Sequence, residues 1–183
     1  MRKVIMLVLV VALVAMTAVT ASAQGASGSI ESWNTVSEGS VTPQLNISIS
    51  GPLKGDFGWM VWTLNSEAWS EGYAGLTYAP AEWIEVSSGI GLETDDNPFR
   101  MGHSVFLEKD RWSFLSIFEH GGSGYWYRNV AKFQVTERFA VGVEKRRFFG
   151  TGFHADLSVG RISLWGTQAF TANERVIGVR FKF

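Results

Sequence analysis

The sequence predicts an all-β chain that folds as an antiparallel up-and-down barrel of about twelve strands. Two observations carry this prediction. Apolar and polar residues alternate in short runs, which is the pattern of strands with one face against an apolar environment. The links between the runs are short, as antiparallel neighbours allow. A helical period of about 3.6 residues is missing, and no segment after residue 23 has the roughly 18 consecutive apolar residues of a transmembrane helix.

The first residues have the pattern of a secretory signal peptide. Arg2 and Lys3 form a basic start, an almost unbroken apolar run covers 4–19, and Ala21-Ser22-Ala23 is an A-x-A cleavage site. The apolar run is shorter than the roughly 20 residues that a membrane-spanning helix needs. We therefore expect a signal peptide at 1–23 and a β-barrel at 41–183. Between them we expect a polar segment at 24–40, and the sequence does not decide whether this segment contains a first strand.

Composition limits the function classes. A length of 183 residues suits one domain or one closed sheet. The 16 Lys and Arg against 17 Asp and Glu, with no basic cluster, argue against a nucleic-acid partner. The absence of cysteine excludes a disulfide framework, a thiolate metal site and a cysteine-anchored lipoprotein. We expect no cofactor.

The strands follow from the alternation, element by element. The first, 29–37, is the weakest because its apolar residues do not alternate cleanly, and 56–65 and 111–120 are apolar on both faces, so that their facing is unassigned. If 29–37 is a flexible leader and 152–168 is one bent strand, the count falls to ten. In chain order the expected strands cover 29–37, 44–51, 56–65, 72–79, 82–93, 99–108, 111–120, 125–135, 138–147, 152–159, 162–168 and 174–183.

The links between these strands suggest two different rims. Very short links are expected at 79–81, 109–110, 136–137 and 160–161, with 51–55 intermediate. Longer links are expected between them, at 66–71, 94–98, 120–124 and 170–173. An up-and-down barrel with tight turns at one rim and longer loops at the other has this arrangement.

The position of the aromatic residues favours a barrel whose apolar face meets lipid. Aromatic side chains gather near the strand ends, as in the two interfacial girdles of a transmembrane barrel. The polar face also contains small residues, such as Gly89 and Gly142, which suit a crowded lumen. The residues assigned to the girdles are Phe57, Trp59, Tyr73, Tyr78, Trp83, Phe99, Trp112, Tyr125, Trp126, Tyr127, Phe148 and Phe149.

The last strand carries a family resemblance. Ile177, Val179, Phe181 and Phe183 lie on one face of an amphipathic strand that ends in Phe. This strand resembles the terminal signal of Gram-negative outer-membrane β-barrel proteins. The resemblance implies that the barrel assembly machinery reads these four residues, and that the chain is exported to the outer membrane and surrounded by its lipid. It covers the signal peptide, the last strand and the general strand pattern, and it identifies no subfamily.

The polar face is the candidate lumen. Acids and bases on it are nearly balanced, so we expect most of them to pair across the lumen, since unpaired charges away from bulk water are costly. A narrow wet path is the alternative. The charged residues of this face are Glu85, Glu93, Arg100, Glu108, Arg128, Lys132, Glu144, Arg146, Asp156, Arg180 and Lys182.

Candidate chemistry is weak. His154, Asp156 and Ser158 share one face of a strand and are the ingredients of a nucleophilic triad, but alternate residues lie roughly 6.5 Å apart, whereas a triad needs contacts of about 2.6–3.2 Å. The neighbours His103 and Ser104 face opposite ways. We therefore expect these residues to be ordinary lumen and interface residues.

A metal site is not expected either. The histidines at 103, 120 and 154 are scattered, the acidic run 94–97 lacks the spacing of a calcium loop, and the glycines of 121–124 precede no helix that could complete a phosphate cradle.

The sequence thus predicts a small outer-membrane barrel, either structural or a passive porin-like channel for small polar solutes. Two alternatives stay open. One is an outer-membrane enzyme that modifies lipid, similar to a lipid A deacylase. The other is a secreted, soluble, ligand-binding barrel.

Overall fold

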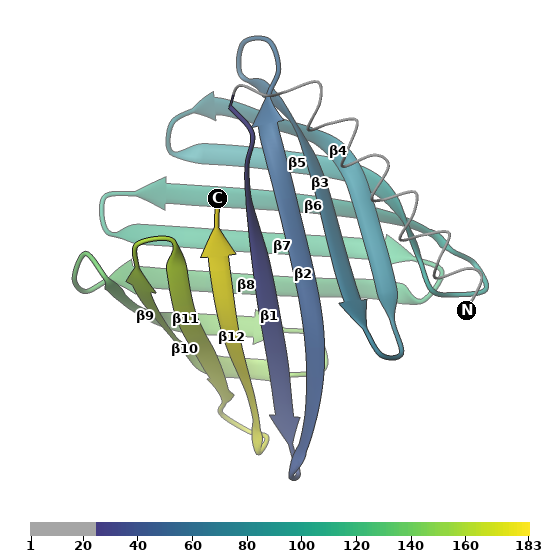
Figure 1. Cartoon of the computed structure of the whole chain (residues 1–183), viewed down its shortest axis with the longest axis vertical. Helices are drawn as coiled ribbons and strands as arrows, with labels where there is room; N and C mark the ends of the chain where they lie inside the picture. The colour runs from purple at the N-terminus through teal and green to yellow at the C-terminus, as the bar shows by residue number, and fades with distance from the viewer. Residues whose placement is uncertain (1–24) are drawn as a thin grey trace.

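The computed structural model describes residues 25–183, which form a closed barrel of twelve antiparallel strands (Figure 1). The prediction of twelve strands is confirmed, and the alternative of ten is wrong. The strands are β1 Ser27–Ser37, β2 Ser40–Pro52, β3 Phe57–Ser66, β4 Ser70–Ala81, β5 Ile84–Glu93, β6 Phe99–Lys109, β7 Trp112–Gly121, β8 Gly124–Gln134, β9 Phe139–Arg146, β10 Gly150–Val159, β11 Ile162–Ala169 and β12 Glu174–Lys182. Among residues 25–183 no helix is long and apolar enough to cross a membrane.

Every strand pairs with its neighbours in the sequence, and β1 pairs with β12 to close the barrel. The first strand, which the sequence predicted only weakly, is therefore a full member, and the barrel begins at Ser27 rather than at residue 41. Its register sets Glu31 opposite Arg180, so that a charged pair lies across the closing seam. The predicted signal peptide lies outside the described residues.

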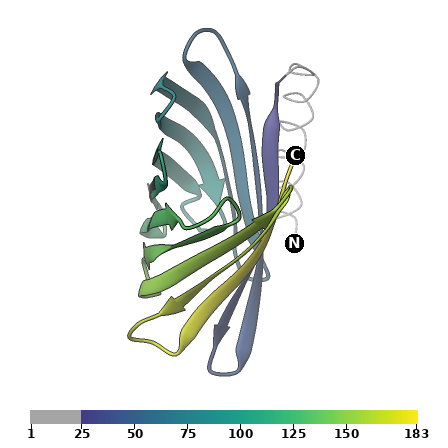
Figure 2. The ribbon, with the colours of Figure 1, turned by 90° about the vertical axis from the view of Figure 1, so that its left-hand side faces the viewer.

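The strands are strongly tilted, as barrel closure requires. In Figure 1 the wall of β12, β1 and β2 crosses the wall of β5 to β8 at a large angle, and Figure 2 shows the same two walls from the side, facing each other across the interior. The C-terminal strand β12 therefore faces the middle strands β6 and β7. This opposition of walls positions the charged groups described below.

Two rims bound the barrel. We call the rim that holds the end of β12 the C-terminal rim, and the other the opposite rim. All the links are short, with two to five residues, and short and longer ones occur at both rims. The predicted alternation of tight turns and longer loops is therefore wrong. The β7–β8 link, for example, keeps only residues 122–123 because both strands extend further than the sequence indicated.

Three of the two-residue turns, at 38–39, 110–111 and 160–161, contain residues with positive φ. Glu38 and Gly39, with φ of 49° and 83°, join β1 to β2 in a two-residue turn. Positive φ at both positions matches the right-handed twist of the flanking strands. The residues of this turn thus fix the register of the first hairpin, in which Ser37 is opposite Ser40.

The outer surface is apolar, and aromatic residues mark both of its rims. Phe57, Tyr78, Trp83 and Trp112 are exposed near the C-terminal rim. Phe99, Tyr125 and Phe148 are exposed near the opposite rim. This is the arrangement of two aromatic girdles around an apolar band.

Three residues assigned to the girdles point elsewhere: Tyr73, Phe149 and Trp126, which shares the inner face of β8 with Arg128. Tyr73 and Phe149 are buried inside the barrel, each 5% exposed. Tyr73 is inward because it alternates with the outward Leu76 and Tyr78 along β4, and Phe149 follows the inward Arg146 across the β9–β10 link. The strand ends alone could not reveal this difference.

Candidate functional site: the barrel lumen

Alternation along the strands gathers the charged residues inside the barrel. On β6, for example, Arg100 is buried while Phe99 next to it is half exposed on the outside. The same alternation sets Arg128 and Glu144 on the inner faces of β8 and β9. Outside and inside are thus inverted relative to a soluble protein, in which the apolar face is buried.

The first group of charges, the Arg100 cluster, lies near the opposite rim on β4 to β7 and contains Glu71, Tyr73, Glu93, Arg100 and Glu119. The guanidinium of Arg100 lies 2.6 Å from Glu93 Oε2, 3.2 Å from Glu119 Oε2 and 3.2 Å from Glu71 Oε2. Its Nε also donates to the Tyr73 hydroxyl at 2.6 Å. One base is therefore shared by three buried carboxyl groups.

The Arg100 cluster also holds the β7–β8 link. The backbone N–H of Ser123 donates to Glu93 Oε1 at 2.8 Å, and its hydroxyl donates to Glu93 Oε2 at 2.9 Å. Arg100 in turn donates to the Ser123 hydroxyl oxygen at 2.8 Å. A short loop at the opposite rim is therefore fixed by side chains that point into the lumen.

The second group, the Glu144 cluster, lies on β8 to β11 and contains Arg128, Glu144, Arg146, His154 and Thr167. Arg128 donates to both carboxylate oxygens of Glu144, at 3.0 and 3.1 Å. Thr167 donates to Oε2 at 2.8 Å, and Arg146 Nε lies 3.8 Å from Oε1. Glu144 is fully buried, with 0% exposed. Charge-assisted, bidentate contacts of this kind are the strong ones.

Aromatic rings pack against the Glu144 cluster. The Arg128 guanidinium lies 4.7 Å from the centroid of the Trp33 ring, and the Arg146 guanidinium lies 4.8 Å from that of Phe149. Trp33 and Trp165 meet edge to face at 5.7 Å. These contacts, within the range of cation–π attraction, narrow the lumen on this side.

The closing seam adds a third charged contact. Glu31 Oε1 accepts a hydrogen bond from Trp165 Nε1 at 2.6 Å and another from Arg180 Nε at 2.7 Å. The indole of Trp165 has room because β12 has a glycine opposite it, and a Cβ at Gly178 would overlap the ring. The seam between the first and last strands is thus joined by side-chain contacts as well as by backbone pairing.

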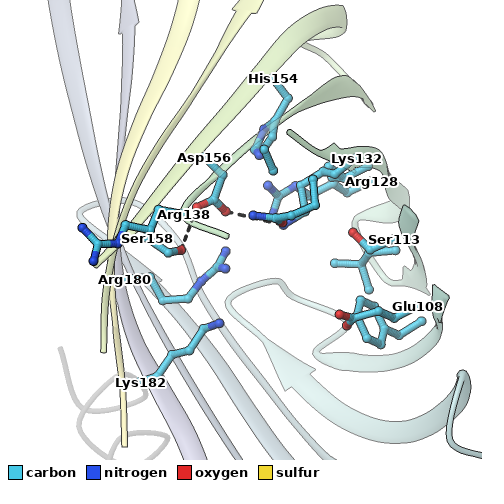
Figure 3. A pocket seen from close by; sticks show the side chains of 15 residues that line it. Glu108, Ser113, Arg128, Lys132, Arg138, His154, Asp156, Ser158, Arg180 and Lys182 are labelled. Carbon is cyan, nitrogen blue, oxygen red and sulfur yellow. Dashed lines mark hydrogen bonds and ion pairs between the residues drawn. The ribbon is translucent and has the colours of Figure 1, made fainter. Parts of the chain in front are cut away.

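A cavity of about 280 Å³ opens below these clusters, toward the C-terminal rim. Figure 3 shows Arg180 and Lys182 on one side of it, Glu108 and Ser113 on the other, and Lys132 with Asp156 between them. Lys132 Nζ lies 3.4 Å from Asp156 Oδ2, a looser contact than those of the two clusters. The cavity lining is mostly polar, and its basic residues outnumber its acidic ones.

The structure places all the residues assigned to the lumen on inward-facing strand positions, and most of them in the two clusters or around the cavity. Arg100, Arg128, Lys132, Arg146 and Arg180 each have an acidic partner. Glu85, Glu108 and Lys182 form no ion pair with another residue of 25–183. All three are exposed and near the C-terminal rim.

The three residues of the suspected triad do not form a catalytic relay. Ser158 donates to Asp156 Oδ1 at 3.2 Å, but His154 turns the other way, to Thr167 at 2.9 Å and Glu144 at 3.4 Å. A nucleophile needs its base within hydrogen-bond reach. In this arrangement the imidazole supports the Glu144 cluster instead.

The second candidate pair is divided between the two faces of β6, with Ser104 on the inner face. His103 lies on the outer face, where its Nδ1 is 3.0 Å from the Ser88 hydroxyl, and its ring stacks 6.1 Å from that of His120. Within 25–183 no group of three or more His, Cys, Asp and Glu side chains could hold a metal ion.

Sequence reasoning missed three acids that the structure places at the centre of the lumen contacts: Glu31, Glu71 and Glu119. Glu31 lies in the strand whose alternation was unclear, and Glu71 was assigned to a link. Glu119 lies in a strand that is apolar on both faces, where the outward Phe118 and the inward Ile117 and Leu115 hide the period. A search for isolated carboxylates in apolar strands could have found Glu119.

Comparison with solved structures shows which known fold this barrel shares. The KdgM porin superposes with a TM-score of 0.59 at 13% identity, over 85% of this chain and 99% of that chain. The KdgM porin in complex with disordered oligogalacturonate gives 0.59 at 14%, over 85% and 99%. The NanC porin gives 0.52 at 10%, over 85% and 100%. No protein-family model and no curated protein matches the sequence. The chain therefore has the fold of small outer-membrane porins.

Proposed function

We propose that this chain is a small porin-like channel in the bacterial outer membrane, which lets small polar solutes pass passively. The observation that carries the proposal is the inverted polarity of the barrel. Its outer face exposes apolar side chains in a band between two aromatic rims, and its inner face holds charged and hydroxyl groups. Such an exterior requires lipid, and such an interior favours water and polar solutes.

The lumen has a narrow and a wide part. Near the opposite rim, the charged side chains of the Arg100 and Glu144 clusters fill the lumen and are almost inaccessible to solvent. Toward the C-terminal rim the cavity of about 280 Å³ remains open. This volume is below the usual range of roughly 300–1,000 Å³ for pockets that hold drug-sized ligands. The proposed solutes are accordingly small.

The charge of the cavity favours anions over cations. Lys132, Arg138, Arg180 and Lys182 line it, against Glu108 and Asp156. The KdgM structure that is described as a complex with oligogalacturonate, a polyanion, concerns a barrel of the same fold. That likeness supports a channel through which anions pass, and the small cavity supports short ones.

Assembly and location belong to the same proposal. Ile177, Val179 and Phe181 face outward on β12, and Phe183 follows them. We propose that the assembly machinery of the outer membrane reads this face, after export directed by residues 1–23. A chain that lacks Phe183 should accumulate outside the membrane fraction in cells, whereas a Phe183→Tyr chain should not. Equal recovery of the truncated chain and of Phe183→Tyr in the membrane fraction would show that the assembly machinery does not need Phe183.

The first experiment is a pair of measurements on the mature chain folded in detergent. A transmembrane barrel should migrate faster on a gel without boiling, and after transfer to planar bilayers it should give stepwise conductance. Folding without detergent would show instead a secreted, soluble barrel. Hydrolysis of phospholipid or lipid A that is lost with Ser158→Ala would show a lipid enzyme and would overturn the proposed channel.

A further inference from the structure

The charged groups of the lumen are divided between two facing walls. The wall of β4 to β7 carries inward Glu71, Glu85, Glu93, Glu108 and Glu119, and Arg100 is its one inward base. On the wall of β8 to β12 the bases exceed the acids. The inward bases there are Arg128, Lys132, Arg146, Arg180 and Lys182, and the inward acids are Glu144, Asp156 and Glu174.

In the narrow part of the lumen the charged side chains pair within the clusters. At the cavity Lys132 pairs with Asp156 and Arg180 pairs with Glu31, and other charged residues there have no ion-pair partner within 25–183. Glu108 lines the cavity from β6, and Glu85 faces the same interior from β5, opposite Phe106. Neither forms an ion pair with another described residue. Across the interior, Lys182 on β12 is equally unpaired, with Arg180 beside it on the same face (Figure 3). The free negative and positive charges thus face each other.

We infer that this cavity recognises small zwitterions, such as free amino acids, whose ammonium group is held by Glu85 and Glu108 while the carboxylate is held by Lys182. This inference rests on the proposed channel. An anion is attracted by the basic wall but repelled by Glu85 and Glu108, so that part of its attraction is lost. A solute that carries both charges is attracted at both ends, provided that it lies across the lumen rather than along it.

The size of the cavity fits such a solute. About 280 Å³ accommodates a molecule of a few heavy atoms with some water. The walls on which the charges lie are close enough for one cavity to be lined by both Glu108 and Lys182. A short zwitterion with water-mediated contacts can therefore meet both walls, since bridging waters are nearly as favourable as direct hydrogen bonds.

The test compares two isomers. Alanine and lactamide have the same atoms, but alanine is a zwitterion at neutral pH and lactamide is uncharged. The full mature chain is reconstituted in liposomes, and osmotic swelling gives the permeation rate of each. We expect the alanine to lactamide ratio to be about fivefold higher than through Glu85→Gln/Glu108→Gln, the factor equivalent to one ion pair in bulk water. Lys182→Gln should lower the ratio as well.

A matched control and an electrical measurement distinguish recognition of a zwitterion by both walls from a general effect of charge on permeation. Lys145→Gln removes a cation from the outer face of β9 and should leave the ratio unchanged. In Glu85→Gln/Glu108→Gln, the reversal potential in a salt gradient should shift toward anions while the preference for alanine falls. Heat-dependent gel migration shows whether each variant is folded.

The outcomes are distinct. If lactamide and alanine permeate wild-type liposomes at equal rates, or if the ratio survives in both variants, the zwitterion inference is overturned and the channel stands. If liposomes with folded wild-type protein do not swell in either solute, the channel itself fails, and the inference fails with it.

Discussion

The two halves of the lumen treat charge in opposite ways. In the half near the opposite rim, Arg100, Arg128 and Glu144 are buried and contact several partners each. In the half near the C-terminal rim, Glu108 and Lys182 are exposed to the cavity, and the Lys132–Asp156 contact is long. The same inward-facing strand positions thus produce a structural core at one level and an open polar cavity at another.

The difference teaches that an inward charge is not by itself a functional charge. A buried ion pair stabilises little relative to apolar packing, but the loss of one partner leaves an uncompensated charge in a medium that solvates it poorly. A charge that faces water has no such dependence on a partner and is available to a solute. The comparison therefore predicts different results for the same type of substitution in the two halves.

The largest effect is expected at Glu144. Glu144→Leu leaves Arg128 and Arg146 buried without their shared acid, and should lower the free energy of unfolding by about 3–5 kcal/mol. Urea unfolding of the lipid-reconstituted barrel, followed by tryptophan fluorescence, measures this. Glu108→Leu, the control in the cavity half, should change the free energy by no more than about 0.5 kcal/mol. Equal losses in the two variants would contradict the division of the lumen into two halves.

A smaller effect is expected where the backbone makes room for the core. Gly178→Ala places a methyl group against the Trp165 indole and should cost about 1–3 kcal/mol of unfolding free energy, as overpacking does. Gly166→Ala on β11 is the control, because its Cβ would point outward and meet only the backbone oxygen of Val176, at 3.3 Å. A destabilisation that is no larger for Gly178→Ala than for Gly166→Ala would show that Trp165 can move aside.

The fold could be predicted from the sequence because the strand period is two and lipid keeps one face apolar. On β9, for example, the apolar residues Phe139, Val141 and Val143 alternate with inward residues, and this pattern alone identifies the strand and its outer face. The facing of each such strand also follows, since a slip by one residue would exchange the faces. Strand β1 was less certain because Trp33 points inward, against the apolar-out pattern, to fill the lumen beside Trp165.

The contents of the lumen could be predicted only in part. Alternation indicates that Arg128 and Glu144 face inward, but their pairing depends on the stagger between β8 and β9, in which Arg128 lies opposite Arg146. The sharing of Arg100 by acids from β4, β5 and β7 joins strands that are not all neighbours. Contacts across a lumen depend on the barrel's diameter and tilt, which no local pattern encodes.

The smallest effect is expected at the border between the two halves, where Lys132 meets Asp156. The Lys132 side chain is 28% exposed, and exposed ion pairs contribute about 0–1 kcal/mol. Lys132→Gln should therefore lower the unfolding free energy by less than about 1 kcal/mol at low salt. Because salt screens exposed charges within roughly 3 Å at 1 M ionic strength, the difference from the wild type should vanish at that concentration, whereas the loss in Glu144→Leu should persist. If Lys132→Gln lowers the unfolding free energy as much as Glu144→Leu does, and salt does not change this loss, then the Lys132–Asp156 pair belongs to the buried half of the lumen.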